Sequence, residues 1–252
     1  MDTRDLRIKL FADGADRRAI LELANNPLIS GFTTNPTLMR KAGVTDYEAF
    51  ARDIAEAIPD RSISFEVFAD DFDEMERQAY QIASWGDQVY VKVPVTNTAG
   101  ESSAPLIARL SHQGVKVNAT ALMTLDQVAE MTYALADGAP SYISVFAGRI
   151  ADTGRDPVPF MRSALDIIRP QPQIELIWAS PRELLNIFQA NQMGCHIITA
   201  TSDLLKKLDL VGRDLSEYSL ETVRMFYDDA SKSGFSLNQP LHMEQSALMP
   251  SA

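Results

Sequence analysis

The sequence predicts an α/β fold, namely a single (β/α)8 TIM barrel with additional C-terminal helices. Two observations lead to this prediction: the chain has 252 residues, and eight short apolar or β-branched runs alternate with amphipathic segments of helical length. Strands that alternate with helices form parallel sheets, and eight such units in about 250 residues are typical of a closed barrel. A doubly wound open sheet is the alternative, but no Gly-x-Gly-x-x-Gly pattern follows the first run.

The predicted strands are spread over most of the chain. In order, they are Ile8–Asp13, Gly31–Asn35, Ser62–Val67, Val89–Val93, Val115–Ala121, Tyr142–Ala147, Ile174–Ser180 and Cys195–Ala200. Helical patterns between them include Asp73–Ser84, Ser103–Gln113, Thr124–Asp137, Pro157–Ile168 and Arg182–Gln192. Two more helical patterns follow the last strand, Ser202–Leu210 and Leu220–Lys232.

Local signals mark where several helices begin and end. Asp16 and Asp46 suit N-cap positions, while Gly114, Gly138 and Gly194 stand where helices are expected to end before a strand. We therefore expect one barrel domain over residues 1–237, including the C-terminal helix. Residues 238–252 have no periodic pattern, so we expect a tail that is flexible or packed on a neighbouring subunit of a homo-oligomer.

Composition limits the possible partners. The formal net charge is -11, and an acidic surface repels nucleic acid and anionic lipid, so we expect neither as a partner. No stretch approaches eighteen apolar residues and the first residues lack an apolar segment, which predicts a cytoplasmic protein without a membrane span. A single cysteine, Cys195, excludes an intramolecular disulfide. The expected partners are small molecules.

Polar side chains recur at the C-terminal ends of the predicted strands. Strands of a barrel are buried on both faces and read as apolar, whereas active sites of barrels are built at these ends. The candidate site residues at or just beyond the strand ends are Asp13, Thr33, Asn35, Glu66, Lys92, Asn118, Thr120, Ser144, Phe146, Arg149, Ser180 and Arg182.

Lys92 is the most informative of these residues, because it lies within the apolar run Val89–Pro94. Burial disfavours a charged ammonium group, and a neutral amine can attack a carbonyl to form a Schiff base. The alternative is a lysine that is buried only in a salt bridge with Glu66 or Asp13. A lysine together with two carboxylates at strand ends suits aldol chemistry, in which one carboxylate is ionised and the other protonated.

Arg149, Ser180 and Arg182 follow the sixth and seventh predicted strands. Barrels often bind phosphate near the loops after their last strands, and two guanidinium groups with a hydroxyl suit a phosphate monoester. A surface salt bridge is the alternative role for either arginine. The three histidines, His112, His196 and His242, have no metal-ligand spacing, so no metal site is predicted.

Taken in order, these segments resemble a known family. Its successive motifs are similar to Phe11-Ala12-Asp13, Thr33-Thr34-Asn35-Pro36-Thr37-Leu38, Phe65-Glu66-Val67, Val91-Lys92-Val93-Pro94, Val117-Asn118-Ala119-Thr120, Ser144-Val145-Phe146-Ala147-Gly148-Arg149-Ile150 and Ala179-Ser180-Pro181-Arg182. The sequence thus resembles the transaldolases from the first strand to the last helices. This resemblance implies a (β/α)8 barrel and a class I aldol mechanism without cofactor or metal, in carbohydrate metabolism such as the pentose phosphate pathway.

The resemblance also implies a role for each candidate. Lys92 would form the Schiff base, Glu66 and Thr120 would hold the catalytic water, and Asp13 would be the acid/base for the cleaved hydroxyl. Substrate-binding positions would be Thr33, Asn35, Asn118, Ser144 and Phe146, with Arg149, Ser180 and Arg182 on the phosphate. In transaldolases a dihydroxyacetone unit passes from a ketose phosphate, such as fructose 6-phosphate or sedoheptulose 7-phosphate, to an aldose phosphate.

The same family contains fructose 6-phosphate aldolases, which are lyases that release dihydroxyacetone. Those enzymes carry Gln at the position of Glu66 and Tyr at the position of Phe146, so both positions here are of the transaldolase type. A transferase is therefore the expected activity, a lyase the first alternative, and a non-catalytic barrel that binds sugar phosphates the second.

Overall fold

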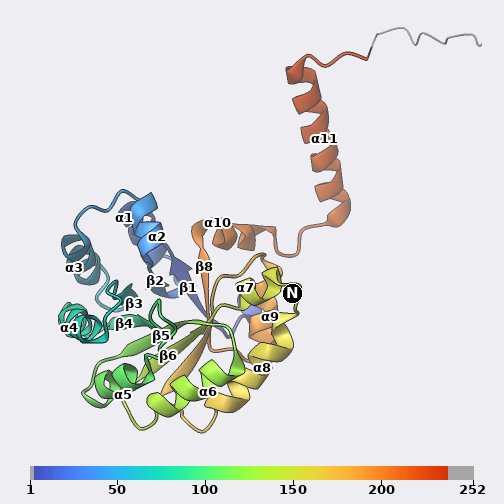
Figure 1. Ribbon diagram of the computed structural model, residues 1–252. Helices are drawn as coiled ribbons and strands as arrows, with labels where there is room; N and C mark the ends of the chain where they lie inside the picture. Colours follow the sequence, from blue (N-terminus) through green and yellow to red (C-terminus); the bar gives the residue numbers. More distant parts are fainter. Residues whose placement is uncertain (1–2, 238–252) are drawn as a thin grey trace, which may run out of the picture. The chain divides into compact units, whose positions relative to one another are not determined.

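The computed structural model describes residues 3–237, which fall into two compact units that divide between Val211 and Gly212. In the first unit, eight parallel strands pair in the order β1-β2-β3-β4-β5-β6-β7-β8 and close on themselves (Figure 1). The predicted (β/α)8 TIM barrel is thereby confirmed. The predicted domain over residues 1–237 spans both units and stays a prediction, and the tail 238–252 lies outside the described residues.

The bounds of the elements are as follows. The strands are β1 (Lys9–Asp13), β2 (Ile29–Thr33), β3 (Ser62–Glu66), β4 (Val89–Pro94), β5 (Val117–Leu122), β6 (Ser141–Val145), β7 (Ile174–Trp178) and β8 (Ile197–Thr201). The α-helices are α1 (Arg17–Ala24), α2 (Pro36–Lys41), α3 (Tyr47–Ala57), α4 (Phe72–Ala83), α5 (Ala104–His112), α6 (Leu125–Ala134), α7 (Ala147–Asp152), α8 (Pro157–Ile168), α9 (Leu185–Met193), α10 (Ser202–Leu205) and α11 (Leu215–Ser233). Two 3-10 helices are η1 (Thr3–Asp5) and η2 (Lys206–Leu210).

The predicted helix signals act largely as expected. Asp16 and Asp46 cap α1 and α3, and each side chain accepts a hydrogen bond from the amide three residues on, at 2.8 and 2.9 Å. Gly114 and Gly194 follow α5 and α9 with φ of 87° and 81°, a left-handed conformation that glycine adopts without strain. Before β6 the positive φ falls one residue before Gly138.

Most predicted boundaries shift by one to three residues, and two of the differences are each accompanied by a helix cap. β2 covers Ile29–Thr33 rather than Gly31–Asn35, since Asn35 caps α2 and accepts a hydrogen bond from the Leu38 amide at 3.0 Å. The last helix begins at Leu215 instead of Leu220, because the Asp214 side chain accepts hydrogen bonds from the Ser216 and Glu217 amides of the first turn. The pattern Ser202–Leu210 divides into α10 and η2.

Aromatic rings fill the centre of the barrel. The Phe11 ring meets the edge of Tyr142 at 5.8 Å between centroids, and Tyr142 stacks on Tyr90 at 3.9 Å. Gly31 makes room for them, because a Cβ there would lie 2.6 Å from the Phe11 ring. Side chains two residues further along a strand share its face, so they line the barrel above these rings. On β1, β4 and β6, which carry these three rings, the residues two positions further on are Asp13, Lys92 and Ser144.

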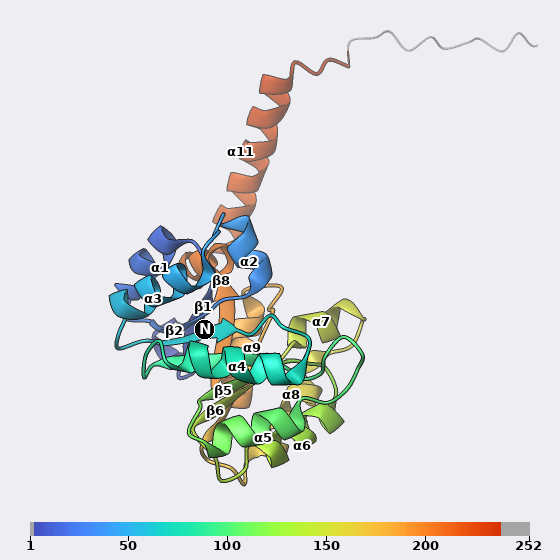
Figure 2. The ribbon, with the colours of Figure 1, turned by 60° about the vertical axis from the view of Figure 1, so that its left-hand side comes forward.

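A second apolar layer lies between the strands and the surrounding helices, where Ile54, Ile107, Leu110, Met131 and Met161 are fully buried. Helices α4, α5 and α6 follow one another around the outside of the barrel (Figure 2). None of the described helices combines the length and hydropathy needed to cross a bilayer.

Candidate active site

A cavity of about 520 Å³ opens at the C-terminal ends of the strands. Ten of the twelve candidate residues line it, and Asn118 and Arg182 do not. The ten come from strand ends or adjoining loops of seven of the eight β/α units. Chain segments far apart in sequence therefore supply one site, as is general for barrel enzymes.

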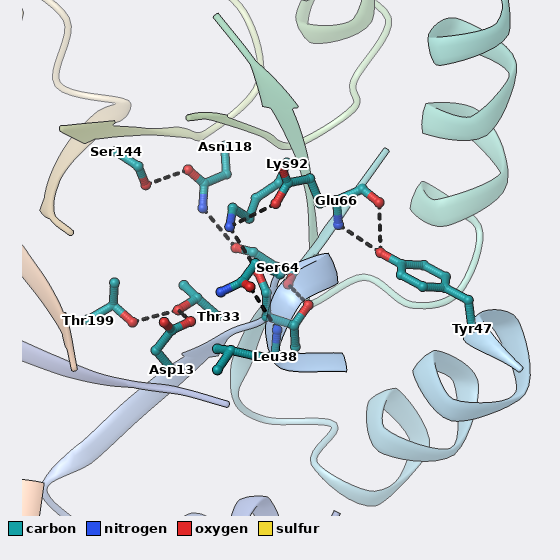
Figure 3. Close-up of polar contacts among 12 residues, drawn as sticks. Asp13, Thr33, Leu38, Tyr47, Ser64, Glu66, Lys92, Asn118, Ser144 and Thr199 are labelled. Carbon is teal, nitrogen blue, oxygen red and sulfur yellow. Dashed lines mark hydrogen bonds and ion pairs between the residues drawn. The ribbon is translucent and has the colours of Figure 1, made fainter. Parts of the chain in front are cut away.

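Lys92 lies in this wall with only 7% of its surface exposed. Its Nζ donates a hydrogen bond to the Thr34 carbonyl oxygen at 2.9 Å and lies 3.2 Å from Glu66 Oε2 (Figure 3). Glu66 and Lys92 are register partners on the adjacent strands β3 and β4, so their side chains stand on the same barrel face. The buried lysine thus has a carboxylate partner, as a purely structural salt bridge would require, and the same contact suits proton transfer at the amine.

Asp13 stands across the cavity at the end of β1. It accepts a hydrogen bond from Thr33 Oγ1 at 2.7 Å, and that hydroxyl lies 2.6 Å from Thr199 Oγ1. Although Asp13 is partly open to the cavity, the surrounding protein raises the pKa of its carboxyl group by desolvation. The Lys92 charge and the Thr33 hydrogen bond lower this pKa and the Glu66 charge raises it, with a net increase. A carboxyl group in this setting can retain a proton nearer to neutral pH.

A buried polar chain supports the floor of the cavity. Ser144 Oγ donates to Asn118 Oδ1 at 2.7 Å, and Asn118 Nδ2 donates to Ser64 Oγ at 3.0 Å (Figure 3). Asn118 is fully buried, and hydrogen bonds at both its oxygen and its nitrogen fix the orientation of its amide. Thr120, two residues further on the same face of β5, has a buried Oγ1 without a hydrogen-bond partner among the described residues. A buried hydroxyl of this kind is suited to bind a water molecule or a substrate oxygen.

Arg149, Ser180 and Phe146 also line the cavity. The Arg149 guanidinium carbon is 5.7 Å from the centroid of the Phe146 ring. Arg182 instead pairs through two nitrogens with Asp152 on α7, with Nε 2.8 Å from Oδ1. Its third nitrogen donates to Ser180 Oγ at 2.9 Å, so Arg182 stands behind the cavity wall.

The backbone around Ser180 is held in an uncommon conformation. Ser180 has a φ of 61° and Ala121 one of 67°, and both residues line the cavity. Positive φ in residues other than glycine is uncommon and concentrates at functional sites. A Cβ at Gly148 would lie 1.6 Å from the Ser180 carbonyl oxygen, so only glycine lets α7 approach this loop so closely.

Several residues of the site were not among the predicted ones. Ser64 and Thr199 are polar residues inside apolar strands, and this departure from the apolar pattern could have identified them. Ser64 also lies two positions before Glu66, on the same face of its strand. Tyr47 bonds to the main chain of Glu66 from α3, and nothing in its sequence context indicates this.

Comparison with known proteins identifies the family of this chain. The sequence profile described as transaldolase/fructose-6-phosphate aldolase matches residues 10–239. The chain belongs to this family. A probable transaldolase of Dehalococcoides mccartyi is 33% identical over 202 residues, which cover 80% of this chain and 90% of that protein. A probable transaldolase of Streptococcus agalactiae is 32% identical over 226 residues, which cover 89% of this chain and all of that protein.

Solved structures with low identity share the fold of this transaldolase/fructose-6-phosphate aldolase family member. The putative copper homeostasis protein CutC from Streptococcus agalactiae has a TM-score of 0.58 at 12% identity, over 77% of this chain and 98% of that one. A putative lyase/mutase from Burkholderia cenocepacia has a TM-score of 0.56 at 12% identity, over 90% and 84%. These likenesses concern the barrel alone, since one fold carries many activities.

Proposed function

We propose that this protein transfers a dihydroxyacetone unit from a ketose phosphate, such as fructose 6-phosphate or sedoheptulose 7-phosphate, to an aldose phosphate. The observation that supports this best is the buried Lys92 Nζ, 3.2 Å from Glu66 Oε2 in the wall of a cavity that also contains Asp13. A barrel that only binds sugar phosphates does not need a buried amine beside two carboxylates. Membership of a family of transaldolases and aldolases agrees with the proposal.

In the first half-reaction, Lys92 passes a proton to Glu66, the amine so released attacks the C2 carbonyl of the ketose, and water leaves as the imine forms. Glu66, together with a water held by the Thr120 hydroxyl, moves the protons of this step. Asp13 then accepts the proton of the C4 hydroxyl while the C3–C4 bond breaks. The aldose phosphate leaves, and the bonding electrons remain on the lysine-bound unit as an enamine.

The second half-reaction runs the same steps in reverse with a different aldehyde. The enamine carbon attacks the carbonyl carbon of the acceptor, and Asp13 returns its proton to the new hydroxyl. Water then adds to the imine, and the product ketose leaves as Lys92 regains its free amine. Atoms and electrons balance without a further reactant, and the carboxylate of Glu66 stabilises the cationic imine beside it.

Substrate recognition involves the other candidate residues, which line the cavity or lie just behind its wall. Arg149 and Ser180 suit the phosphate group, and Arg182 can join them if it leaves Asp152. Asn118 and Ser144, which already hydrogen-bond one another, suit the hydroxyls of the dihydroxyacetone unit. Thr33 and Asn35 extend this polar wall, because both line the same cavity. We also propose that the protein works in the cytoplasm as a homo-oligomer.

Transfer is favoured over simple cleavage by Glu66 and Phe146. A carboxylate stabilises the imine by its charge, and Phe146 has no hydroxyl with which to protonate the enamine directly. The enamine on Lys92 therefore persists until an acceptor aldehyde binds. Release of free dihydroxyacetone, as in a fructose 6-phosphate aldolase, is the alternative outcome.

Borohydride trapping with fructose 6-phosphate tests the proposal. We expect a reduced adduct on the peptide that contains Lys92, detected by mass spectrometry, and turnover that requires erythrose 4-phosphate as acceptor. An adduct with fast release of dihydroxyacetone in the absence of acceptor would indicate a lyase. Binding of the ketose without any adduct would indicate a non-catalytic barrel.

A further inference from the structure

The main-chain ladder between β2 and β3 ends just before the site. Thr34 N donates to the Ser64 carbonyl oxygen at 3.1 Å, and regular parallel pairing would continue with Glu66 N donating to Thr34 O. That bond is replaced, because Thr34 O accepts from Lys92 Nζ at 2.9 Å. The chain then turns into α2 at Pro36. Glu66 is thus left without a strand partner on this side.

One side chain takes the place of the missing strand. Tyr47, the first residue of α3, donates its hydroxyl proton to Glu66 O at 2.7 Å and accepts from Glu66 N at 2.9 Å (Figure 3). A phenolic hydroxyl can make both bonds at once. Both main-chain groups of Glu66 are therefore satisfied by Tyr47, at the residue whose carboxylate lies beside Lys92.

Tyr47 is itself held firmly. Its ring packs against Phe65, Phe68 and Trp85, with centroid distances of 6.4, 5.4 and 5.9 Å. Asp46 caps the helix at the residue before it. Burial raises the pKa of Tyr47 well above its ordinary value, so its hydroxyl remains a protonated donor. A rigid side chain of this kind can fix the backbone that it contacts.

We propose that Tyr47 is a positioning residue for the reaction, which completes the end of β3 and thereby aims the Glu66 carboxylate at the Lys92 amine. Tyr47 is not among the residues that line the cavity, so it acts through Glu66. The direction of the Glu66 side chain depends on its backbone dihedral angles, and these are set by the two bonds to Tyr47. The kinetic consequence rests on the proposed transaldolase chemistry, whereas the structural consequence does not.

Amide hydrogen exchange tests the structural part without any substrate. Tyr47→Phe removes the hydroxyl and keeps the ring packing, and we expect the Glu66 amide to exchange at least about 10-fold faster. The Val67 amide, which donates to Lys92 O at 3.0 Å, is the internal reference and is expected to keep its rate. Tyr80→Phe is the matched control, because it removes a surface hydroxyl bond to Gln113. Unchanged exchange at Glu66 in Tyr47→Phe would overturn the proposal.

Steady-state kinetics test the effect on the reaction. We expect Tyr47→Phe to lower kcat for transfer by about 10- to 100-fold with little change in KM, since misplaced catalytic groups reduce the chemical step. In a Glu66→Gln background, the same change is expected to lower kcat by less than about threefold, because the two residues act as a unit. Fully multiplicative effects would mean that Tyr47 does not act through Glu66.

A second variant guards against a general loss of structure. Asp46→Ala removes the helix cap and leaves the Tyr47 hydroxyl in place, so we expect a smaller change in the same direction in both exchange and kcat. A Glu66 amide unaffected by Asp46→Ala and Tyr47→Phe alike would reject the role of Tyr47. Absence of a trapped Lys92 adduct in the wild type would reject the transfer chemistry, and the exchange result would still decide the structural role.

Discussion

Glu66 and Lys92 are register partners on neighbouring strands, and their charged groups lie 3.2 Å apart at the end of the barrel. A regular backbone feature thus generates the central contact of the site. Because alternate residues of a strand share a face, no loop is needed to bring the two side chains together. The contact is largely buried, so each group depends on the other for its environment.

The first prediction concerns the amine. Lys92→Met is expected to abolish both transfer and the borohydride adduct, because a thioether cannot form an imine. The variant is expected to keep the circular dichroism spectrum of the wild type, since Met fills a similar volume. Lys116→Met is the matched control, because Lys116 precedes β5 and donates to the Asp87 carbonyl oxygen instead. Measurable turnover by purified Lys92→Met would contradict the Schiff-base assignment.

The second prediction concerns the phosphate. Arg149→Ala is expected to weaken transition-state binding of phosphorylated substrates by about 1.5–3 kcal/mol, roughly 10- to 150-fold in kcat/KM. Arg182→Ala is expected to have a smaller effect, because Arg182 gives up its pair with Asp152 when it turns to a phosphate. Arg169→Ala, which breaks a surface pair with Asp166, is the control. Equal losses with unphosphorylated fructose would mean that these arginines have a structural role.

The third prediction separates transfer from cleavage. Glu66→Gln removes the charge that stabilises the imine, and Phe146→Tyr supplies a hydroxyl within the cavity. We expect the single change to depress transfer and the double variant to raise the ratio of dihydroxyacetone release to transfer. The measurement is release of dihydroxyacetone with and without erythrose 4-phosphate. Fast release by the wild type without an acceptor would instead identify a fructose 6-phosphate aldolase.

The fourth prediction follows from Asp13. Desolvation raises its pKa above the ordinary value near 3.8, so protonated Asp13 stabilises the folded state at low pH, and this contribution is lost as pH rises through the folded-state pKa. Asp13→Asn is uncharged throughout. We therefore expect it to raise Tm relative to the wild type at pH 8, by a margin that shrinks as the pH falls towards 4, while transfer is largely lost. A Tm difference that is independent of pH would contradict a raised pKa of Asp13 in the folded state.

The fifth prediction concerns the close approach of α7 to the loop after β7. Gly148→Ala is expected to destabilise the protein by about 1–3 kcal/mol, because a Cβ would overlap the Ser180 carbonyl oxygen. It is also expected to impair activity towards phosphorylated substrates, since Arg149 and Ser180 must shift. Gly14→Ala is the steric control, because a Cβ there meets no atom within 4 Å. Equal unfolding midpoints in urea for the two variants would contradict this packing.

The sequence by itself determined the fold and the strand ends at which the site lies. Apolar runs that alternate with helical patterns specify parallel β/α units, and a lysine or carboxylate inside such a run stands out because its burial is unfavourable. Ten of the candidate residues line one cavity for this reason, since the C-terminal ends of parallel strands meet at one end of a barrel. Resemblance to the transaldolases added their expected roles.

Only the tertiary structure decided how these side chains are held. The pairing of Arg182 with Asp152 and the burial of Asn118 beneath the cavity depend on which elements pack together, and neither leaves a pattern in the sequence. Tyr47 is the clearest case, because it stands at the start of a helix 19 positions before Glu66. A periodic pattern in the sequence indicates which face of an element is buried. The Tyr47 hydroxyl, by contrast, bonds to Glu66 only because β2 ends early and α3 places Tyr47 beside it.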